Sequence, residues 1–209
     1  MKVFYFLRLL LNLSRIARNP QDTQAGLSIA DCLYKMGLLD HELKIIKNDP
    51  DGARYMILRK FLPTYDLQEL HKLPSGTLGH NYADHMIKHQ LQPDFYKKLE
   101  IVDEVTYLMM RMRETHDLWH IMTGFGTSVP EELGLQAFMF GQMGTPLAPI
   151  LICGRSLVAT FKNPSEVPEI FNQVAKGWEM GKKAKPLFAL DWELHWQTPL
   201  SDLRSQYNL

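Results

Sequence analysis

The sequence has little cysteine, no excess of either charge and no long uninterrupted apolar run. Only Cys32 and Cys153 are cysteines among 209 residues, and their apolar contexts are typical of buried thiols rather than of a disulfide framework. Lys plus Arg and Asp plus Glu both number 23, so the net charge is zero and no nucleic-acid partner is expected. The longest apolar candidate, around 146–161, is interrupted by Pro149 and Arg155 and predicts no membrane-spanning helix.

Strand-like alternation and internal repeats are also absent, and apolar residues recur at helical spacing almost throughout. Hydrophobic residues make up 45% of the chain, which is enough to bury a core. We therefore predict an all-α fold, a single-domain helical bundle over residues 1–209. Capping residues, glycines and prolines place the expected helices at about 22–37, 49–62, 66–71, 77–90, 103–123, 130–141, 147–161, 165–180 and 199–206.

Residues 1–18 carry basic and apolar residues but no acidic residue. Arg8, Asn12 and Arg15 follow i, i+4, i+7 spacing, so on a helix they form one polar stripe on an otherwise apolar surface. Three interpretations remain open, namely an amphipathic helix at a membrane interface, an organelle transit peptide, and a core helix with one wet face. Because the chain begins directly in this amphipathic segment, we expect a bacterial-type protein.

The most informative pattern is His116, Asp117 and His120 within one helical stretch. Histidines four residues apart lie on one face of a helix, and the adjacent carboxylate can reach the same point, which is how a metal is gripped from a rigid element. The apolar stripe that contains Val105 and Met112 continues into the histidines, so they are expected to point inward, where unpaired polar groups are costly. We expect one divalent metal here, with zinc first and iron as the alternative.

A fourth ligand is expected from the next helix. Ser128 and Glu131 fit a capping box, which gives Glu131 a structural role and leaves Glu132 to face the partner helix. The short loop 124–127 is expected to fold the two helices into an antiparallel hairpin. The sequence therefore predicts Glu132 as the fourth metal ligand.

Other polar residues give weaker signals. Arg111 and Arg113 flank the motif, and we expect Arg113 to hold a carboxylate on a substrate, with solvent exposure as the alternative for at least one of the two arginines. His80 and His85, with His89, lie on the helix expected over 77–90, and because His80 and His85 share no face, solvated histidines are expected there rather than a second metal site.

The motif His116-Asp117-x-x-His120, with Glu132 after eleven further residues, belongs to a set of spaced motifs that covers nearly the whole chain. The others are Leu73-Pro74 through Thr77-Leu78-Gly79 and Tyr82, Arg111-x-Arg113-Glu114, Gln142 with Pro146, Trp178, Trp192-Glu193 and Leu203-Arg204. Together they resemble the coenzyme Q (ubiquinone) biosynthesis protein 4 family. His85 departs from the family pattern, in which an aromatic residue is expected.

The resemblance implies an all-helical homodimer, bound as a peripheral membrane protein at the cytoplasmic face in a bacterium or the matrix side of the inner membrane in a mitochondrion. It implies His116, Asp117, His120 and Glu132 as metal ligands. The implied function is ubiquinone biosynthesis, with a metal-dependent carbon–carbon lyase catalysing oxidative C1 decarboxylation of a polyprenyl hydroxybenzoate alongside other quinone-biosynthesis proteins. The alternative is a non-catalytic isoprenoid-lipid-binding scaffold that organises those enzymes. A His-Asp phosphohydrolase fits less well, because no convincing upstream His and downstream Asp accompany the motif.

Overall fold

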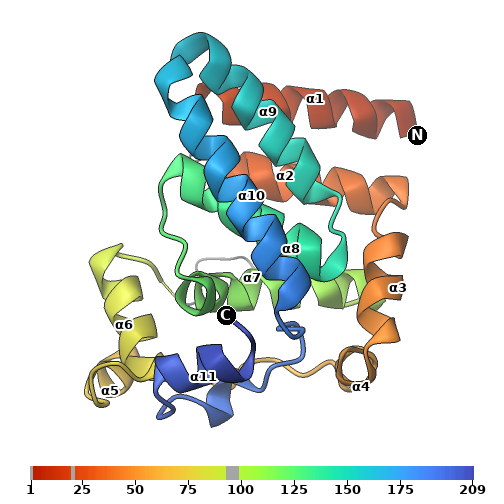
Figure 1. The fold of residues 1–209 in the computed structure, drawn as a ribbon. Coiled ribbons are helices and arrows are strands. Elements are labelled where there is room, and N and C mark those ends of the chain that lie inside the picture. The colour runs from red at the N-terminus through yellow and green to blue at the C-terminus, as the bar shows by residue number, and fades with distance from the viewer. Residues whose placement is uncertain (1, 20–21, 93–98) are drawn as a thin grey trace. The chain divides into compact units, whose positions relative to one another are not determined.

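The computed structural model describes residues 2–19, 22–92 and 99–209, and in these ranges the protein is built from helices (Figure 1). No β-strand occurs within them, although Thr77 and Pro199 form an isolated antiparallel bridge. The predicted all-α class is confirmed.

The contacts within the chain divide it into two compact units. Unit 1 comprises Met1–Ile45 with Gly126–Lys182, and unit 2 comprises Ile46–Phe125 with Lys183–Leu209. The helices with most or all of their residues in unit 1 are α1 (Lys2–Arg18), α2 (Thr23–Met36), α3 (Asp40–Asn48), α8 (Val129–Met143), α9 (Leu147–Lys162), η1 (Pro164–Glu166) and α10 (Val167–Lys183). Those of unit 2 are α4 (Pro50–Leu58), α5 (Leu67–His71), α6 (Leu78–Lys88), α7 (Glu104–Thr123), η2 (Trp192–Leu194) and α11 (Leu200–Gln206). The assignment of residues 1–209 to a single domain stays a prediction.

Local signals place most helix ends where the sequence predicts them. The Asp22 carboxylate accepts a hydrogen bond from the Ala25 N–H at the start of α2, and Gly37 ends that helix in the left-handed region with a φ of 71°. Asp49 caps α4 in the same way. The helix Asp40–Asn48 was not predicted, because it is short and mostly polar and has few apolar positions to reveal its period.

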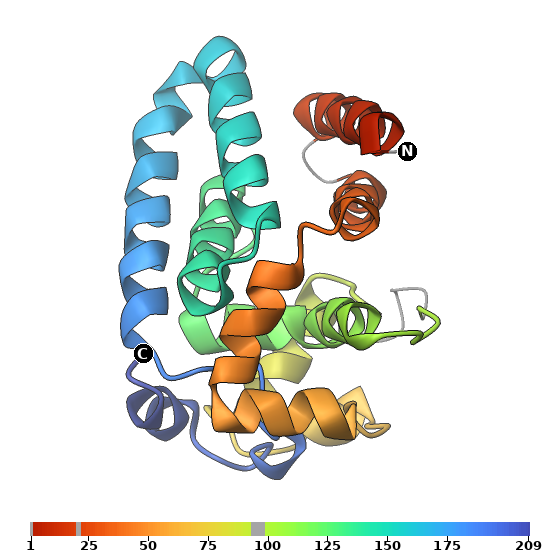
Figure 2. The same ribbon diagram turned by 90° about the vertical axis from the view of Figure 1, so that its right-hand side faces the viewer.

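The core of unit 1 lies among α8, α9 and α10. Leu133, Ala159 and Ile170, one from each helix, form a buried cluster that further partly buried aliphatic side chains surround. Figure 2 shows α9 and α10 as the two arms of a hairpin joined through η1. Gly177 on α10 lets this helix approach α8 so closely that an added Cβ would lie 1.9 Å from the Gly134 carbonyl oxygen.

Of the polar stripe of α1, only Asn12 is buried, whereas Arg8 and Arg15 stay exposed. Asn12 is only 3% exposed, and its side chain donates to the Arg8 carbonyl at 2.8 Å. The Arg15 guanidinium contacts Asp22 at 3.0 Å and Arg8 contacts Asp31 at 3.5 Å, so both cations of the stripe pair with acids at the start of α2 and within it. Only two apolar side chains of α1 are buried with Asn12. The packed side of this helix therefore carries Leu9 and Ile16 around Asn12, and the two exposed arginines reach acids of the α2 segment.

The opposite face of α1 is apolar and exposed. Leu7 is 60% exposed and Leu11 62% exposed, in a helix whose apolar residues outnumber its charged ones. The exposed large apolar side chains of α1 are Val3, Phe4, Phe6, Leu7, Leu10 and Leu11. The interpretation of this segment as a core helix with one wet face is therefore wrong, because burying the apolar face is what defines a core helix. The amphipathic helix predicted over 1–18 is α1, although Met1 lies outside the described residues.

No helix of the described ranges is both long enough and apolar enough to span a bilayer.

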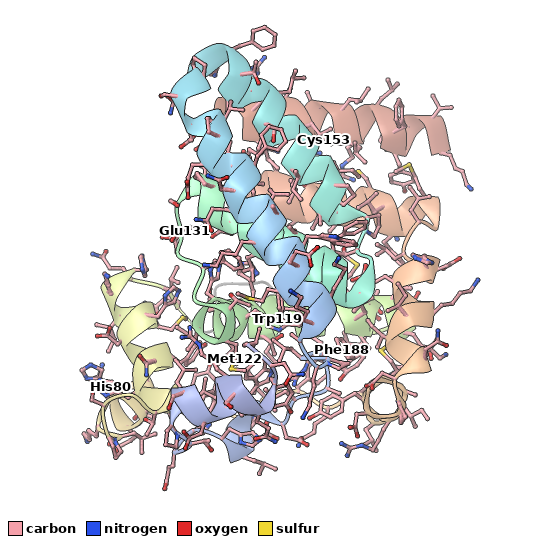
Figure 3. All side chains as sticks on the ribbon, in the orientation of Figure 1. His80, Trp119, Met122, Glu131, Cys153 and Phe188 are labelled. Atoms are coloured by element: carbon pink, nitrogen blue, oxygen red, sulfur yellow. The ribbon has the colours of Figure 1, made fainter. Side chains whose placement is uncertain are left out.

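Unit 2 is organised around α7. Helices α4, α6 and α11 pack on it, and α5 packs on α6. Figure 3 shows Trp119 and Met122 on α7 and Phe188 in the segment after α10, and the first two side chains are fully buried. Arg204 of α11 donates hydrogen bonds to the carbonyl oxygens of Ile121 and Met122 at 2.9 and 3.0 Å, which satisfies carbonyls that the end of α7 leaves without helical partners. This support holds the C-terminal half of α7, where the predicted metal ligands lie.

Candidate metal centre

The sequence around α7 fixes both ends of this helix. Asp103 and Thr106 form a capping box, in which the Asp103 carboxylate accepts from the Thr106 N–H at 2.7 Å and the Thr106 hydroxyl accepts from the Asp103 N–H at 3.0 Å. Gly124, with a φ of 75°, ends the helix, and its N–H bonds the His120 carbonyl. The last two turns are thus regular helix, and they carry the motif.

His116, Asp117 and His120 come together as the sequence predicts. One ligand atom from each of the three lies within 4.8 Å of the other two. The Nε2 atoms of His116 and His120 are 3.2 Å apart, and the two rings meet edge to face with an interplanar angle of 87°. His120 is 3% exposed, so the inward direction expected from the apolar stripe is confirmed for this residue.

A backbone carbonyl fixes the orientation of the His120 ring. The Nδ1 atom of His120 lies 3.0 Å from the Phe125 carbonyl oxygen, which can only accept a hydrogen bond. Nδ1 therefore carries the proton, and in the neutral ring Nε2 holds its lone pair toward His116. This is the arrangement in which a second hydrogen bond sets the tautomer and direction of a metal-binding histidine.

The geometry of the three side chains fits a divalent metal. Two imidazole nitrogens at 2.0–2.1 Å from one tetrahedral metal are about 3.4 Å apart, which is close to the 3.2 Å between the Nε2 atoms of His116 and His120. Asp117 adds an anionic oxygen donor from the same turn. Two imidazoles and a carboxylate are a donor set for zinc or for a non-haem iron.

Glu132, the predicted fourth ligand, lies in the first turn of α8 and belongs to unit 1, whereas the other three residues belong to unit 2. Its role therefore stays a prediction. The capping box that was used to set Glu131 apart from Glu132 does not form, because Ser128 at the N-cap accepts no side-chain capping bond. Its hydroxyl instead donates to the Glu131 carboxylate, so Glu131 still has a local partner at the start of α8.

The two arginines beside the motif differ. Arg111 is 1% exposed, pairs with Glu114 at 3.3 Å and donates to the Leu190 carbonyl oxygen at 2.8 Å. It ties α7 to the segment before η2, so the alternative of solvent exposure does not apply to Arg111. Arg113 is half-buried and lies three and four residues before His116 and Asp117, on the same side of the helix.

His85 lies next to His116, Asp117 and His120, and this proximity was not predicted from the sequence. Its ring stacks on that of His120 with centroids 5.8 Å apart and an interplanar angle of 22°. Burial lowers the pKa of His85 to about 4, against an opposing effect of Asp117, and His120, His89 and His116 lower it further. The prediction that this histidine is solvated is therefore wrong. The available signal was the spacing of His85 and His89, which repeats the i, i+4 spacing of the motif on α7.

Aromatic side chains line the side of α6 that faces the cluster. The hydroxyls of Tyr65 and Tyr82 are 2.7 Å apart, and the Trp196 ring lies 5.6 and 5.7 Å from their rings. Burial raises the pKa of Tyr65 and of Tyr82, and the negative charge of Asp117 adds to both increases. The metal-binding candidates are thus next to a largely buried aromatic group.

Comparison with known proteins identifies the family. The family model for Coenzyme Q (ubiquinone) biosynthesis protein Coq4 matches residues 19–209, nearly the whole chain. The chain belongs to this family. The resemblance inferred from the spaced motifs is confirmed.

Individual relatives and a solved structure are consistent with this family. A Danio rerio protein named "Ubiquinone biosynthesis protein COQ4 homolog, mitochondrial" is 30% identical over 170 residues, covering 78% of this chain and 61% of the relative. The Nematostella vectensis protein of that name is 32% identical over 174 residues, covering 78% and 81%. A crystal structure of a candidate ubiquinone biosynthesis protein from Nostoc punctiforme PCC 73102 matches with a TM-score of 0.88 and 28% identity, covering 97% of this chain and 95% of that one. The chain thus spans less than two thirds of the Danio rerio relative.

Several residues that carry the Coq4 resemblance have structural roles in unit 2. Gly79 lies so close to the segment after η2 that an added Cβ would be 2.9 Å from the Trp196 carbonyl oxygen, to which its own N–H donates. Glu193 pairs with Lys60, and Leu203 is fully buried beside Arg204. Gly79 thus holds α6 against the segment after η2, Glu193 ties η2 to the segment after α4, and Arg204 holds α11 on α7.

Proposed function

We propose that this Coq4-family chain works in ubiquinone biosynthesis as a metal-dependent carbon–carbon lyase. It binds one divalent metal, zinc first and iron as the alternative, through His116, Asp117 and His120, with Glu132 as the fourth ligand. The observation that carries the proposal is the pair of Nε2 atoms 3.2 Å apart beside a carboxylate on the same turn of α7.

The proposed reaction is oxidative decarboxylation at C1 of a polyprenyl hydroxybenzoate. The bond between C1 and the carboxyl carbon breaks and carbon dioxide leaves, while C1 bonds an oxygen from water and two electrons and two protons pass to an external oxidant such as dioxygen. A bound divalent metal supplies Lewis-acid stabilisation of the ring charge. Arg113 binds the substrate carboxylate, because it shares the face of α7 that carries His116 and Asp117. The Phe125 carbonyl keeps His120 in the metal-binding tautomer.

The exposed face of α1 supports a peripheral membrane location for this chemistry. Its large apolar side chains are exposed, and its charged residues, Lys2, Arg8, Arg15 and Arg18, are all basic, although Arg8 and Arg15 pair with Asp31 and Asp22. Such a helix lies at the surface of a bilayer with its apolar face among the lipids, where a polyprenylated substrate dissolves. We place the protein at the cytoplasmic face in a bacterium or the matrix side of the mitochondrial inner membrane, as a homodimer among other quinone-biosynthesis proteins.

The proposal is tested on the purified full-length chain by elemental analysis and by turnover of a prenylated hydroxybenzoate. The wild type is expected to carry about one divalent metal per chain, and His116→Ala with His120→Ala is expected to lose both metal and turnover. The matched control is His71→Ala with His80→Ala, which removes another pair of contacting histidines, stacked with centroids 5.0 Å apart between α5 and α6.

Metal content that survives the α7 double substitution rejects the site. If the purified chain holds metal and isoprenoid but shows no turnover, the lyase is rejected, and the isoprenoid-binding scaffold remains as the function of this chain.

A further inference from the structure

His85 is a half-buried imidazole with one fully covered nitrogen that makes no hydrogen bond. Its Nε2 atom is fully covered and has no partner among the described residues. Leaving a buried polar atom unsatisfied costs on the order of 1–3 kcal/mol. A side chain retained at that cost in a native structure calls for a ligand, an ion or a function.

The surroundings of His85 point to an ion. The ring stacks on His120 and interacts electrostatically with His116, Asp117 and His89 as well, so the titratable groups that act on it most strongly belong to the motif on α7 or to the end of its own helix. His85 of α6 and the histidines of α7 therefore lie where these two helices pack. The unpartnered nitrogen lies beside the three side chains that fit a metal.

We propose that His85 is an additional imidazole ligand of the metal centre, reaching from α6 to the metal held by His116, Asp117 and His120. This inference rests on the metal binding proposed above. Two rings bound through Nε2 to one metal at an angle of about 90–120° have centroids about 4.5–5.5 Å apart, since each centroid is about 3.2 Å from the metal. The 4.8 Å between His116 and His120 lies in this range, and the 5.8 Å between His85 and His120 lies just beyond it.

A modest rotation of the His85 side chain completes the site. The compact group of ligand atoms contains the three residues of α7 and not His85, so the ring has to turn toward the group when the metal binds. A third imidazole shifts the site toward metals that favour nitrogen, such as zinc, and away from magnesium and calcium, which favour oxygen.

The test uses the full-length chain with His85→Gln and His85→Phe. Zinc affinity is measured by competition with a chelator, and X-ray absorption of the zinc-loaded protein counts the bound imidazoles. Each variant is expected to bind zinc about 10–100-fold more weakly than the wild type and to show two imidazoles where the wild type shows three. The control is His80→Gln, which is expected to bind zinc as the wild type does. His80 stacks on His71 of α5, and Figure 3 labels it beside α5 and α6.

Unfolding of the metal-free variants separates a ligand from a packing role. His85→Phe keeps the ring on His120 and removes the unsatisfied nitrogen, so the metal-free variant is expected to be at least as stable as the wild type while binding zinc less tightly. Unchanged zinc affinity with two imidazoles in the wild type refutes the role of His85 but leaves the α7 site standing. A wild-type chain that binds no zinc refutes both.

Discussion

Glu42 offers a quantitative test of how burial controls the stability of unit 1. This carboxyl group is 4% exposed in α3, and burial raises its pKa to about 8, although the Thr145 hydroxyl donates a hydrogen bond to it and opposes the increase. In the unfolded chain the same group has a pKa near 4.5. The folded protein therefore binds the Glu42 proton more tightly than the unfolded protein does.

The sign and size of the effect follow from this difference. Below pH 4.5 the group is protonated in both states and stabilises neither. Between pH 4.5 and about 8 only the folded state keeps the proton, so the free energy of unfolding falls by about 1.4 kcal/mol for each pH unit. At pH 7.5 the cumulative loss is about 4 kcal/mol, which is a large share of the stability of an ordinary domain.

Glu42→Gln removes the ionisation and keeps an oxygen that can accept from Thr145. We expect the variant to gain about 3 kcal/mol on the wild type between pH 5 and pH 7.5, measured by urea unfolding followed by circular dichroism. Asp40→Asn, an exposed change in the same turn of α3, is the control and is expected to follow the wild-type profile. Parallel pH profiles for Glu42→Gln and the wild type would show that Glu42 is ionised in the folded protein and would refute the reasoning.

Two further predictions concern packing and membrane binding. Gly177→Ala is expected to lower the free energy of unfolding by about 2–4 kcal/mol, because the new Cβ meets the Gly134 backbone. The control is Gly26→Ala, which has nothing within 4 Å of its new Cβ and is expected to be neutral or stabilising. Equal effects of the two substitutions in thermal unfolding would contradict this prediction. Leu7→Glu with Leu11→Glu is expected to reduce sedimentation with anionic lipid vesicles at least about tenfold while helicity is kept, and undiminished sedimentation would rule out the α1 face as the membrane contact.

Helix positions are largely a property of the sequence. Capping carboxylates and left-handed glycines act within a few residues, so Asp22 with Gly37 and Asp103 with Gly124 fix helix ends that can be predicted without knowing the fold. The predicted cap at Ser128 fails because its hydroxyl has a second local partner in Glu131, and the choice between the two contacts depends on geometry.

The direction of an amphipathic helix is not set by its own sequence. The stripe of Arg8, Asn12 and Arg15 can be read from the spacing, but water is only one of its possible partners. Asp22 and Asp31 provide the other for the two exposed arginines, whereas Leu9, Asn12 and Ile16 are the residues that pack. A second apolar face, with Leu7 and Leu11, is left outside.

The candidate metal centre is likewise determined in part by the local sequence and in part by the packing of helices. His116, Asp117 and His120 lie on one helix, so the 3.6-residue period alone brings their ligand atoms together and the sequence by itself determined this part of the site. His85 is far from them in the chain, and only the packing of α6 on α7 decided that its ring lies on His120 with a buried nitrogen beside the cluster. Contacts within a helix follow from its period, whereas contacts between helices depend on how the whole chain buries its apolar surface.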